Sequence, residues 1–550
     1  MLKNENITCY KRLNIDFKNE EAPDRIEFIR PDHCVDVVYP FMYQPINILY
    51  DEHGYETVSE NGNAYPCFRY TPDICGEYKA VAYKANQKID DTTFNVLPSD
   101  NHGYVSVSKK DNKYFAYTDK TPFFSIGINL AMCRPIQLTD HTEFGLSENF
   151  AYLGLRKYEL WFKRCSEYGV NTVRIWLGQN YLNPDTENTY EFDLKKFSLL
   201  DKLIDLAEQY NIKLKLTIEH FRHFEYDNTK TNIFSKQLWD NGKKCESIGE
   251  WLTDERWAKA WLKKADELAR RYSGDTNIFA IELWNEMNCL SGDIISWNRK
   301  YIPKIKSLFP KNMVVNSFGS MDCDWMVDYY KRFCWDESDI VQIHRYIDQG
   351  AEKKICTTPI DMIKDAINIL PDYNKPVIIA ETGAVNDCHS GPFRFYSSDD
   401  RGIIFADTVY TPIFCKSGGC GNIWHWDAAY VESKNLYKMF NPIRTLMRDI
   451  DFENEGFESR DYSDENAYIY TLHGKNAILC YIRNREDSWQ NVLRDCNVPN
   501  TISSISIKAD NIKNAEIITI WNEESATVEI TDSGVIINEL KYGIMLKLTR

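Results

Sequence analysis

Positive charge is scarce in this chain of 550 residues, which has 65 lysines and arginines against 81 aspartates and glutamates. Nucleic acids are bound through their phosphates by Lys and Arg, so the net charge of −16 argues against a nucleic-acid partner. The same deficit argues against binding to anionic membrane surfaces. We therefore expect a neutral substrate, no nucleic acid and no membrane.

Long apolar stretches are missing as well. No run approaches the ~20 residues that a membrane-spanning helix needs. The first residues, Met1-Leu2-Lys3-Asn4-Glu5-Asn6, have none of the apolar character of a signal peptide. These absences favour a cytoplasmic location.

Metal-binding cysteine motifs are also absent. The 16 cysteines are scattered singly, and no Cys-x-x-Cys pair occurs. Cys415 and Cys420 lie closest together in the sequence, and nothing nearby completes a zinc set. In a chain of this size, such scatter is typical of reduced, mostly buried thiols. We predict no cofactor and no metal.

Aromatic residues, in contrast, are abundant. They make up 14% of the chain, with 34 tyrosines and 14 tryptophans. Large hydrophobic cores would explain the excess, and so would surfaces on which sugar rings stack. Composition leaves both explanations open.

Strand patterns dominate both ends of the chain. Val105 and Val107 alternate with serines near the N-terminus, and Ile505 and Ile507 flank a serine near the C-terminus. Between these ends, buried strands alternate with helical segments, which is typical of parallel βα units. We predict an N-terminal β-sandwich domain over 1–118, a (β/α)8 barrel over 119–450 and a C-terminal β-sandwich domain over 451–550.

Eight strands can be counted in the central region, which fits an α/β fold of the TIM-barrel type. The helix predicted over 254–273 has an apolar stripe that includes Trp257 and Trp261, and Gly274 would end it. No repeat of 20–50 residues accompanies the strands. The strands lie near residues 125, 173, 215, 282, 315, 342, 379 and 424.

Two of these strands end in a glutamate. The apolar run from Phe279 ends in Trp284-Asn285-Glu286, and the run from Pro376 ends in Glu381-Thr382-Gly383. Barrel enzymes keep their chemistry at the carboxyl ends of the strands. Breaking a glycosidic bond requires two carboxyl groups, one to protonate the leaving oxygen and one to attack or to activate water. Two such strands therefore predict a catalytic pair.

The Trp284-Asn285-Glu286 and Ile379-Ala380-Glu381-Thr382-Gly383 motifs resemble those on the fourth and seventh strands of clan A retaining glycoside hydrolases, closest to family 5. The resemblance covers about residues 120–450, and the N-terminal β module resembles that of modular members. It implies that Glu286 is the acid/base and Glu381 the nucleophile. It also implies that Asn285 hydrogen-bonds the substrate 2-hydroxyl.

Further site residues follow from the same resemblance. Arg174, in Val173-Arg174-Ile175-Trp176, resembles the arginine that keeps the nucleophile ionised. His344 would line the pocket, and Tyr346 would hydrogen-bond Glu381. Trp426 matches the aromatic residue that floors the −1 sugar site, although Trp424 alternates with it and could be the one that faces inward.

Strict alternation puts Glu282 and Glu286 on one face of their strand and Asn285 on the other. Both Asn285 and Glu286 reach one pocket only if the strand end departs from regular pleating, for example at a bulge. Glu282 then lies buried lower in the strand, where we expect it to pair with an arginine.

The third strand ends in Glu219-His220-Phe221-Arg222-His223, where Glu219 and His220 could contact sugar hydroxyls. His220 and His223 could instead bind a metal, which would point to a metal-dependent hydrolase. Such barrels usually carry His-x-His at the end of the first strand, and here that strand ends in Gly127-Ile128-Asn129-Leu130.

We predict a retaining β-glycosidase that hydrolyses β-linked oligosaccharides by double displacement, with a carbohydrate as its partner. The alternatives are an endo-acting β-glycanase, such as a glucanase or mannanase, a transglycosylase, and a non-catalytic carbohydrate-binding barrel. The sequence leaves the sugar, exo or endo action and the oligomeric state open.

Overall fold

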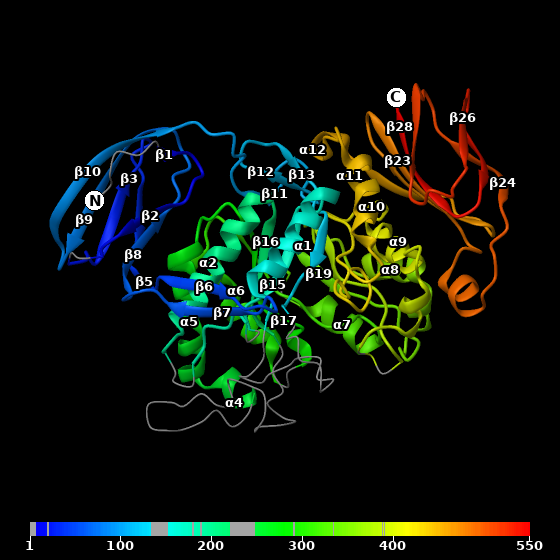
Figure 1. Ribbon diagram of the computed structural model, residues 1–550. Coiled ribbons are helices and arrows are strands. Elements are labelled where there is room, and N and C mark those ends of the chain that lie inside the picture. The colour runs from blue at the N-terminus through cyan, green and yellow to red at the C-terminus, as the bar shows by residue number, and fades with distance from the viewer. Residues whose placement is uncertain are drawn as a thin grey trace.

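The computed structural model describes residues 7–18, 21–133, 152–178, 181–186, 190–220, 248–289, 292–333, 335–387, 389 and 391–550. It has a β module at each end of the chain and an α/β barrel between them (Figure 1). Within the described residues, no helix combines the length and the apolar character that crossing a membrane requires.

The N-terminal module consists of two sheets packed face to face. Ile26 and Phe28 point into its core, where the Phe28 ring stacks on Tyr70 at 3.9 Å. One sheet has the order β1 (Ile7–Thr8), β10 (Gln87–Leu97), β9 (Gly76–Lys84), β3 (Arg25–Ile29), β4 (Val35–Val38). The other has the order β2 (Leu13–Asp16), β8 (Tyr65–Tyr70), β5 (Phe41–Tyr43).

Two parts of this half of the chain pack directly on the barrel. The hairpin β6 (Ile46–Tyr50) and β7 (Glu56–Glu60) sends the Glu56 carboxylate to the backbone N–H of Leu155, at 2.7 Å. Phe115 and Phe123 pack on Phe279 of the barrel. They come from the small sheet β11 (Val105–Val107), β12 (Phe115–Tyr117), β13 (Pro122–Phe123), which spans the predicted boundary at 118/119.

Seven regular parallel strands and one short segment form the closed barrel. The strands are β14 (Gly127–Asn129), β15 (Thr172–Trp176), β16 (Lys213–His220), β17 (Ile278–Asn285), β18 (Met313–Val315), β19 (Val341–His344) and β20 (Val377–Glu381). Parallel bridges from Ile423 to Ile128 and Thr382 supply the eighth position, and a bridge from Ser320, five residues after β18, to His344 of β19 completes the ring. The predicted (β/α)8 fold is therefore confirmed.

The helices surround this ring and follow their sequence signals. Trp257, Trp261 and Leu268 form the buried stripe of the helix at Glu255–Tyr272, and Asp254 caps its first turn. Gly274 follows it with a left-handed φ of +80°. The α-helices are α1 (Gly154–Tyr168), α2 (Leu194–Gln209), α4 (Ile248–Thr253), α5 (Glu255–Tyr272), α6 (Ile294–Leu308), α7 (Asp324–Arg332), α8 (Pro359–Asn368), α9 (Ile403–Val409), α10 (Thr411–Phe414), α11 (Asn441–Met447) and α12 (Phe452–Glu455).

The C-terminal module is a second pair of sheets. Its core includes Ile505 and Ile507, as the alternating pattern predicts. Arg483 ties it to the barrel through a 2.8 Å ion pair with Asp407 of α9. The sheets have the orders β21 (Glu458–Asp461), β22 (Ala467–His473), β23 (Ala477–Asn484), β28 (Gly543–Thr549), β25 (Asn514–Thr519) and β24 (Ile502–Lys508), β27 (Gly534–Leu540), β26 (Thr527–Thr531).

Candidate active site

The backbone conformation changes at Glu286, the first residue after strand β17. Strand β17 ends at Asn285, and Glu286 adopts a left-handed φ of +49°. This conformation is unfavourable for a residue with a Cβ, so the surrounding packing must hold it. The predicted departure from regular pleating is present, but a left-handed residue produces it rather than a bulge.

Glu381 reaches the same site through an irregularity of its own strand. Ile343 of β19 pairs with Ile379 of β20, whereas the next residue, His344, pairs with Glu381. Ala380 is therefore the extra residue of a bulge. Bulges redirect side chains next to active sites, and here the bulge turns the Glu381 carboxylate toward β19.

His344 brings the two carboxylates together. Its Nδ1 atom lies 2.9 Å from Glu286 Oε1 and 3.4 Å from Glu381 Oε2. One ligand atom from each of the three residues lies within 4.8 Å of those of the other two. Retaining glycosidases separate their two carboxyl groups by about 5–5.5 Å and inverting ones by about 6.5–9.5 Å. The separation therefore fits retention.

Arg174 is the hub of the buried charges. Its Nε lies 2.7 Å from Glu282 Oε2, and its Nη2 lies 2.6 Å from Asn285 Oδ1. Its Nη1 binds Glu381 Oε1. Burial alone would raise the pKa of Glu282, but Arg174 and Lys215 lower it to about 2. Glu282 is thus the structural partner of an arginine, as its place lower in the strand predicts.

Glu381 is almost fully enclosed, with 4% of its side chain exposed. The Tyr346 hydroxyl donates to Glu381 Oε2 at 2.6 Å. Burial raises the pKa of Glu381 above its usual value; Glu286 adds to this, while His344, Arg174 and Tyr346 act in the opposite direction. Burial also lowers the pKa of His344 to about 4, so this ring is neutral at pH 7.

Asn285 offers a donor to this site. Its Oδ1 accepts from Arg174, which fixes the orientation of the amide. Its Nδ2 is buried and has no hydrogen-bond partner among the residues that the structure describes. An unpaired buried N–H group costs free energy unless a ligand or water satisfies it. The amide is therefore well placed to donate to a bound hydroxyl.

Glu219 and His220 lie beside this cluster with different surroundings. The Glu219 carboxylate is fully buried and pairs with Lys264 of α5 at 2.8 Å, so it is bound up in an ion pair. The His220 ring stacks on Trp176 with centroids 5.5 Å apart. His223 lies outside the described residues, so the alternative of a His220–His223 metal site cannot be placed in the structure.

The two tryptophans of the eighth position have different surroundings. Trp426 is fully buried and packs edge-on against Trp161 of α1, on the outer layer of the barrel. Trp424 keeps 8% exposure and packs on Trp176, whose ring faces Arg174. The backbone N–H of Trp426 donates to the backbone carbonyl of Trp424 at 2.7 Å. The chain therefore turns between the two residues, and their side chains do not share a face. Of the two, Trp424 contacts Trp176 beside Arg174, so we expect its ring to be the one that faces the site.

Sequence reasoning passed over three contributors to the site. Trp176 packs between His220 and Trp424, and its position two residues after Arg174 on a strand would have placed it on the same face. Lys215 Nζ binds Gln342 Oε1, and Gln342 Nε2 donates to Glu282 at 3.1 Å. Burial lowers the pKa of Lys215 to about 7. No sequence motif marks Lys215 or Gln342.

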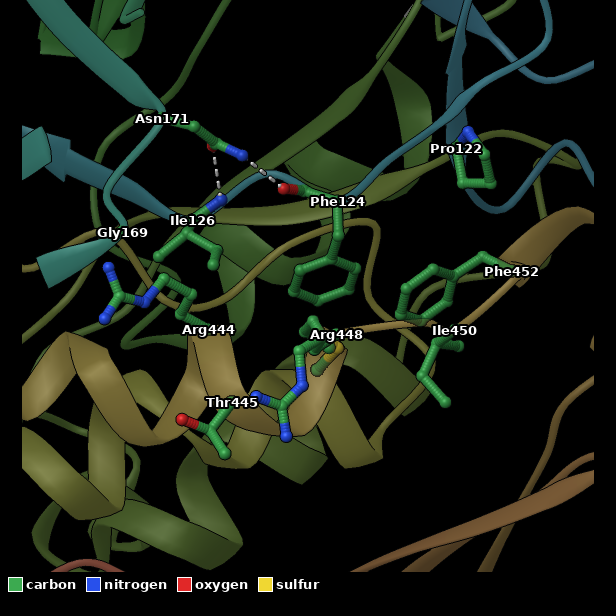
Figure 2. A pocket seen from close by; sticks show the side chains of 11 residues that line it. Pro122, Phe124, Ile126, Gly169, Asn171, Arg444, Thr445, Arg448, Ile450 and Phe452 are labelled. Atoms are coloured by element: carbon green, nitrogen blue, oxygen red, sulfur yellow. Dashed lines mark hydrogen bonds between the residues drawn. The ribbon is translucent and has the colours of Figure 1, made fainter. Parts of the chain in front are cut away.

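A separate pocket of about 540 Å³ lies at the opposite end of the barrel, where β14 and β15 begin (Figure 2). Phe124, Ile126 and Phe452 give it an apolar wall, and Arg444 of α11 and Arg448, the residue after this helix, lie along its edge. None of the predicted site residues lines it. Barrel enzymes keep their chemistry at the carboxyl ends of the strands, so this pocket is not the candidate active site.

Comparison with known proteins agrees with this geometry. Residues 142–400 match the family model described as cellulase (glycosyl hydrolase family 5). A mannan endo-1,4-beta-mannosidase A of Hypocrea jecorina is 26% identical over 170 residues, which are 28% of this chain and 36% of that protein. The match thus spans about a third of the relative's length.

Solved structures resemble the chain more broadly. A putative glycoside hydrolase from Bacteroides vulgatus superposes with a TM-score of 0.59 at 16% identity, covering 99% of this chain and 100% of that chain. A glycoside hydrolase family 5 protein from the same organism gives a TM-score of 0.52 at 14% identity, covering 82% and 94%. At these identities the similarity shows a shared fold.

Proposed function

We propose that this chain, whose barrel has the fold of glycosyl hydrolase family 5, is a retaining β-glycoside hydrolase. One observation carries the proposal. Glu286 and Glu381 reach the same imidazole from two different strands, with one ligand atom from each of the three residues within 4.8 Å of those of the other two. A barrel that only binds sugar has no need of two carboxyl groups at this spacing.

In the first step, a Glu381 oxygen attacks the anomeric carbon as the glycosidic bond breaks, and Glu286 donates its proton to the leaving oxygen. Arg174 and Tyr346 bind the two Glu381 oxygens and so aim the carboxylate. The Asn285 amide donates to the sugar 2-hydroxyl, a contact that strengthens in an oxocarbenium-like transition state.

In the second step, Glu286 takes a proton from water, and the oxygen of this water attacks the anomeric carbon of the glycosyl-enzyme. The bond to Glu381 breaks and its carboxylate is restored. Two inversions give net retention. His344 contacts both carboxylates, which suits a group that must stay neutral while the proton moves on and off Glu286.

Short β-linked oligosaccharides are our first choice of substrate. An endo-acting β-glycanase is the second, and the mannan endo-1,4-beta-mannosidase A similarity favours mannan within that choice. A cytoplasmic location is also a proposal, supported by the scattered cysteines.

The decisive experiment follows the anomer that is released. Wild-type protein should turn over one or more aryl β-glycosides from a panel of sugars, and NMR should show the β-anomer forming first. Glu381→Ala should lower kcat by on the order of 10⁴-fold or more. Glu208→Ala, at an exposed position on α2, serves as the control and should keep full activity. Release of the α-anomer first, or normal turnover by Glu381→Ala, would refute the mechanism.

A further inference from the structure

Two cysteines of the N-terminal module lie in contact although 66 residues separate them. Cys9 Sγ and Cys75 Sγ are 3.1 Å apart. Among the cysteines that the structure describes, no other pair of sulfur atoms is in hydrogen-bond contact. We propose that Cys9 and Cys75 form a disulfide under oxidising conditions, and that this bond fastens the first strand of the chain to the loop between β8 and β9.

Backbone hydrogen bonds already hold the two segments side by side. The Tyr10 N–H donates to the Pro72 carbonyl at 2.7 Å. Tyr10 follows Cys9 directly, and Pro72 lies three residues before Cys75. The Cys9 N–H donates to Leu97 at 2.9 Å, and its carbonyl accepts from Ser99 Oγ at 2.7 Å. Disulfides form without strain only where the backbone already brings both Cβ atoms close. The two segments are thus already adjacent before any bond forms between the sulfur atoms.

The two thiols differ in access. Cys75 is exposed, whereas Cys9 is only 5% exposed. Burial, together with the neighbouring Cys75, raises the pKa of Cys9 to about 12. Cys75 is therefore the first thiol that a small-molecule disulfide meets, and Cys9 is the thiol that resolves the mixed disulfide.

The chemistry is thiol–disulfide exchange with a small-molecule disulfide such as oxidised glutathione. The Cys75 thiolate attacks one glutathione sulfur, which forms a mixed disulfide and releases one glutathione thiolate. The Cys9 thiolate then attacks Cys75 Sγ, which forms the protein disulfide and releases the second glutathione. Two protein thiols are oxidised, one disulfide is reduced to two thiols, and the proton of each cysteine passes to a released glutathione.

The disulfide would stabilise the interface between the N-terminal module and the barrel. Asp73, two residues before Cys75, pairs with Lys311 of the barrel at 2.6 Å. Arg12, three residues after Cys9, pairs with Asp275 of the barrel at 2.8 Å. Both crosslinked segments thus carry an ion pair to the barrel. In a reducing cytoplasm the thiols stay free, and in an oxidising compartment the Cys9–Cys75 disulfide forms.

The test uses the full-length protein treated with oxidised glutathione and mapped by mass spectrometry without reduction. We expect a peptide pair joined through Cys9 and Cys75, lighter by two hydrogen atoms than the free peptides. Because the Cys9 pKa is raised, closure should be faster at pH 9 than at pH 7, with the mixed disulfide on Cys75 accumulating at the lower pH. Oxidation should also raise the melting temperature by roughly 5 °C, and reduction should reverse the shift.

Matched variants identify the bond. Cys75→Ser should abolish both the joined peptide and the melting shift, and its exposed position makes it safe for folding. Cys34→Ser removes another exposed thiol of the same module, in the turn between β3 and β4, and should leave both unchanged. A link from Cys75 to Cys34, or a Cys75 that stays glutathionylated at pH 9, would overturn the proposal.

Discussion

The ends of strands β17 and β20 start from the same sequence pattern and arrive at different environments. Each strand is a buried apolar run that finishes in a glutamate. Glu286 keeps 18% of its side chain exposed, whereas Glu381 keeps 4% and is held by Arg174 and Tyr346. The pattern thus places a carboxyl group at the barrel mouth, and the neighbouring side chains suit Glu381 to the role of nucleophile that we propose.

The sharpest test of this difference is the product formed with azide. Glu381→Ala should be nearly inactive, and added azide should restore turnover by attacking the β-glycoside from the vacated side, which gives the α-glycosyl azide. Glu286→Ala should keep a functional nucleophile, so azide attacks the glycosyl-enzyme and gives the β-glycosyl azide. NMR of the two products checks the assignment. Exchanged configurations would mean that the two roles are reversed.

The leaving group should separate the two variants as well. Glu286→Ala should lose on the order of 10³-fold or more with poor leaving groups but little in the first step with a dinitrophenyl glycoside, which leaves without protonation. Glu381→Ala should be equally poor with both substrates. Stopped-flow release of dinitrophenol measures the first step. A Glu286→Ala variant that loses the same factor with both leaving groups would contradict its role as the acid.

Arg174→Met should have the next largest effect, because this guanidinium binds Glu381, Glu282 and Asn285 together. We expect kcat/KM to fall roughly 10²–10³-fold. Removing a cation raises the pKa of Glu381 further, so the acid limb of the pH profile should move to higher pH. A pH profile of kcat/KM measures both effects. An unchanged acid limb would show that the cation does not act on the nucleophile.

Much of this arrangement could be predicted from the sequence because it depends on strand order and alternation. The eight strands and the two glutamates at strand ends follow from periodicity, and alternation places Glu282 low in its strand, where it pairs with an arginine. The contact of Arg174 with Glu381 follows from the family resemblance instead. Local backbone turns could not be predicted this way. The left-handed Glu286 and the turn between Trp424 and Trp426 break the alternation on which the reasoning relied.

Contacts between residues far apart in the sequence could not be predicted either. Glu219 forms an ion pair with Lys264 of α5, and Cys9 contacts Cys75 within the N-terminal module. The fold brings these residues together, and no rule of sequence spacing connects them. The hairpin β6–β7 likewise lies within the predicted N-terminal domain but packs on the barrel through Glu56.

The two tryptophans of the eighth position allow a further comparison. Trp424→Ala should raise KM by about 10-fold through the loss of an aromatic surface beside Trp176, in addition to the stability lost with a buried ring. Trp426→Ala should instead cost about 3–5 kcal/mol of unfolding free energy, since it empties a buried position beside Trp161. Steady-state kinetics and chemical denaturation of both variants decide. A KM that rises in Trp426→Ala but not in Trp424→Ala would identify Trp426 as the floor of the sugar site, as the family resemblance implies.

Tyr346→Phe should have the smallest effect and refines the account of the nucleophile. The hydroxyl donates to Glu381 Oε2 at 2.6 Å and lowers the pKa of that carboxyl, although burial keeps the pKa above its usual value. Glu381 must be ionised to attack, so wild-type activity should fall as the pH drops through a midpoint above the usual glutamate pKa of about 4.3. Without the hydroxyl, this midpoint should move higher, and kcat/KM at neutral pH should fall about 10-fold. A midpoint that moves to lower pH would mean that Tyr346 stabilises the protonated rather than the ionised form of Glu381.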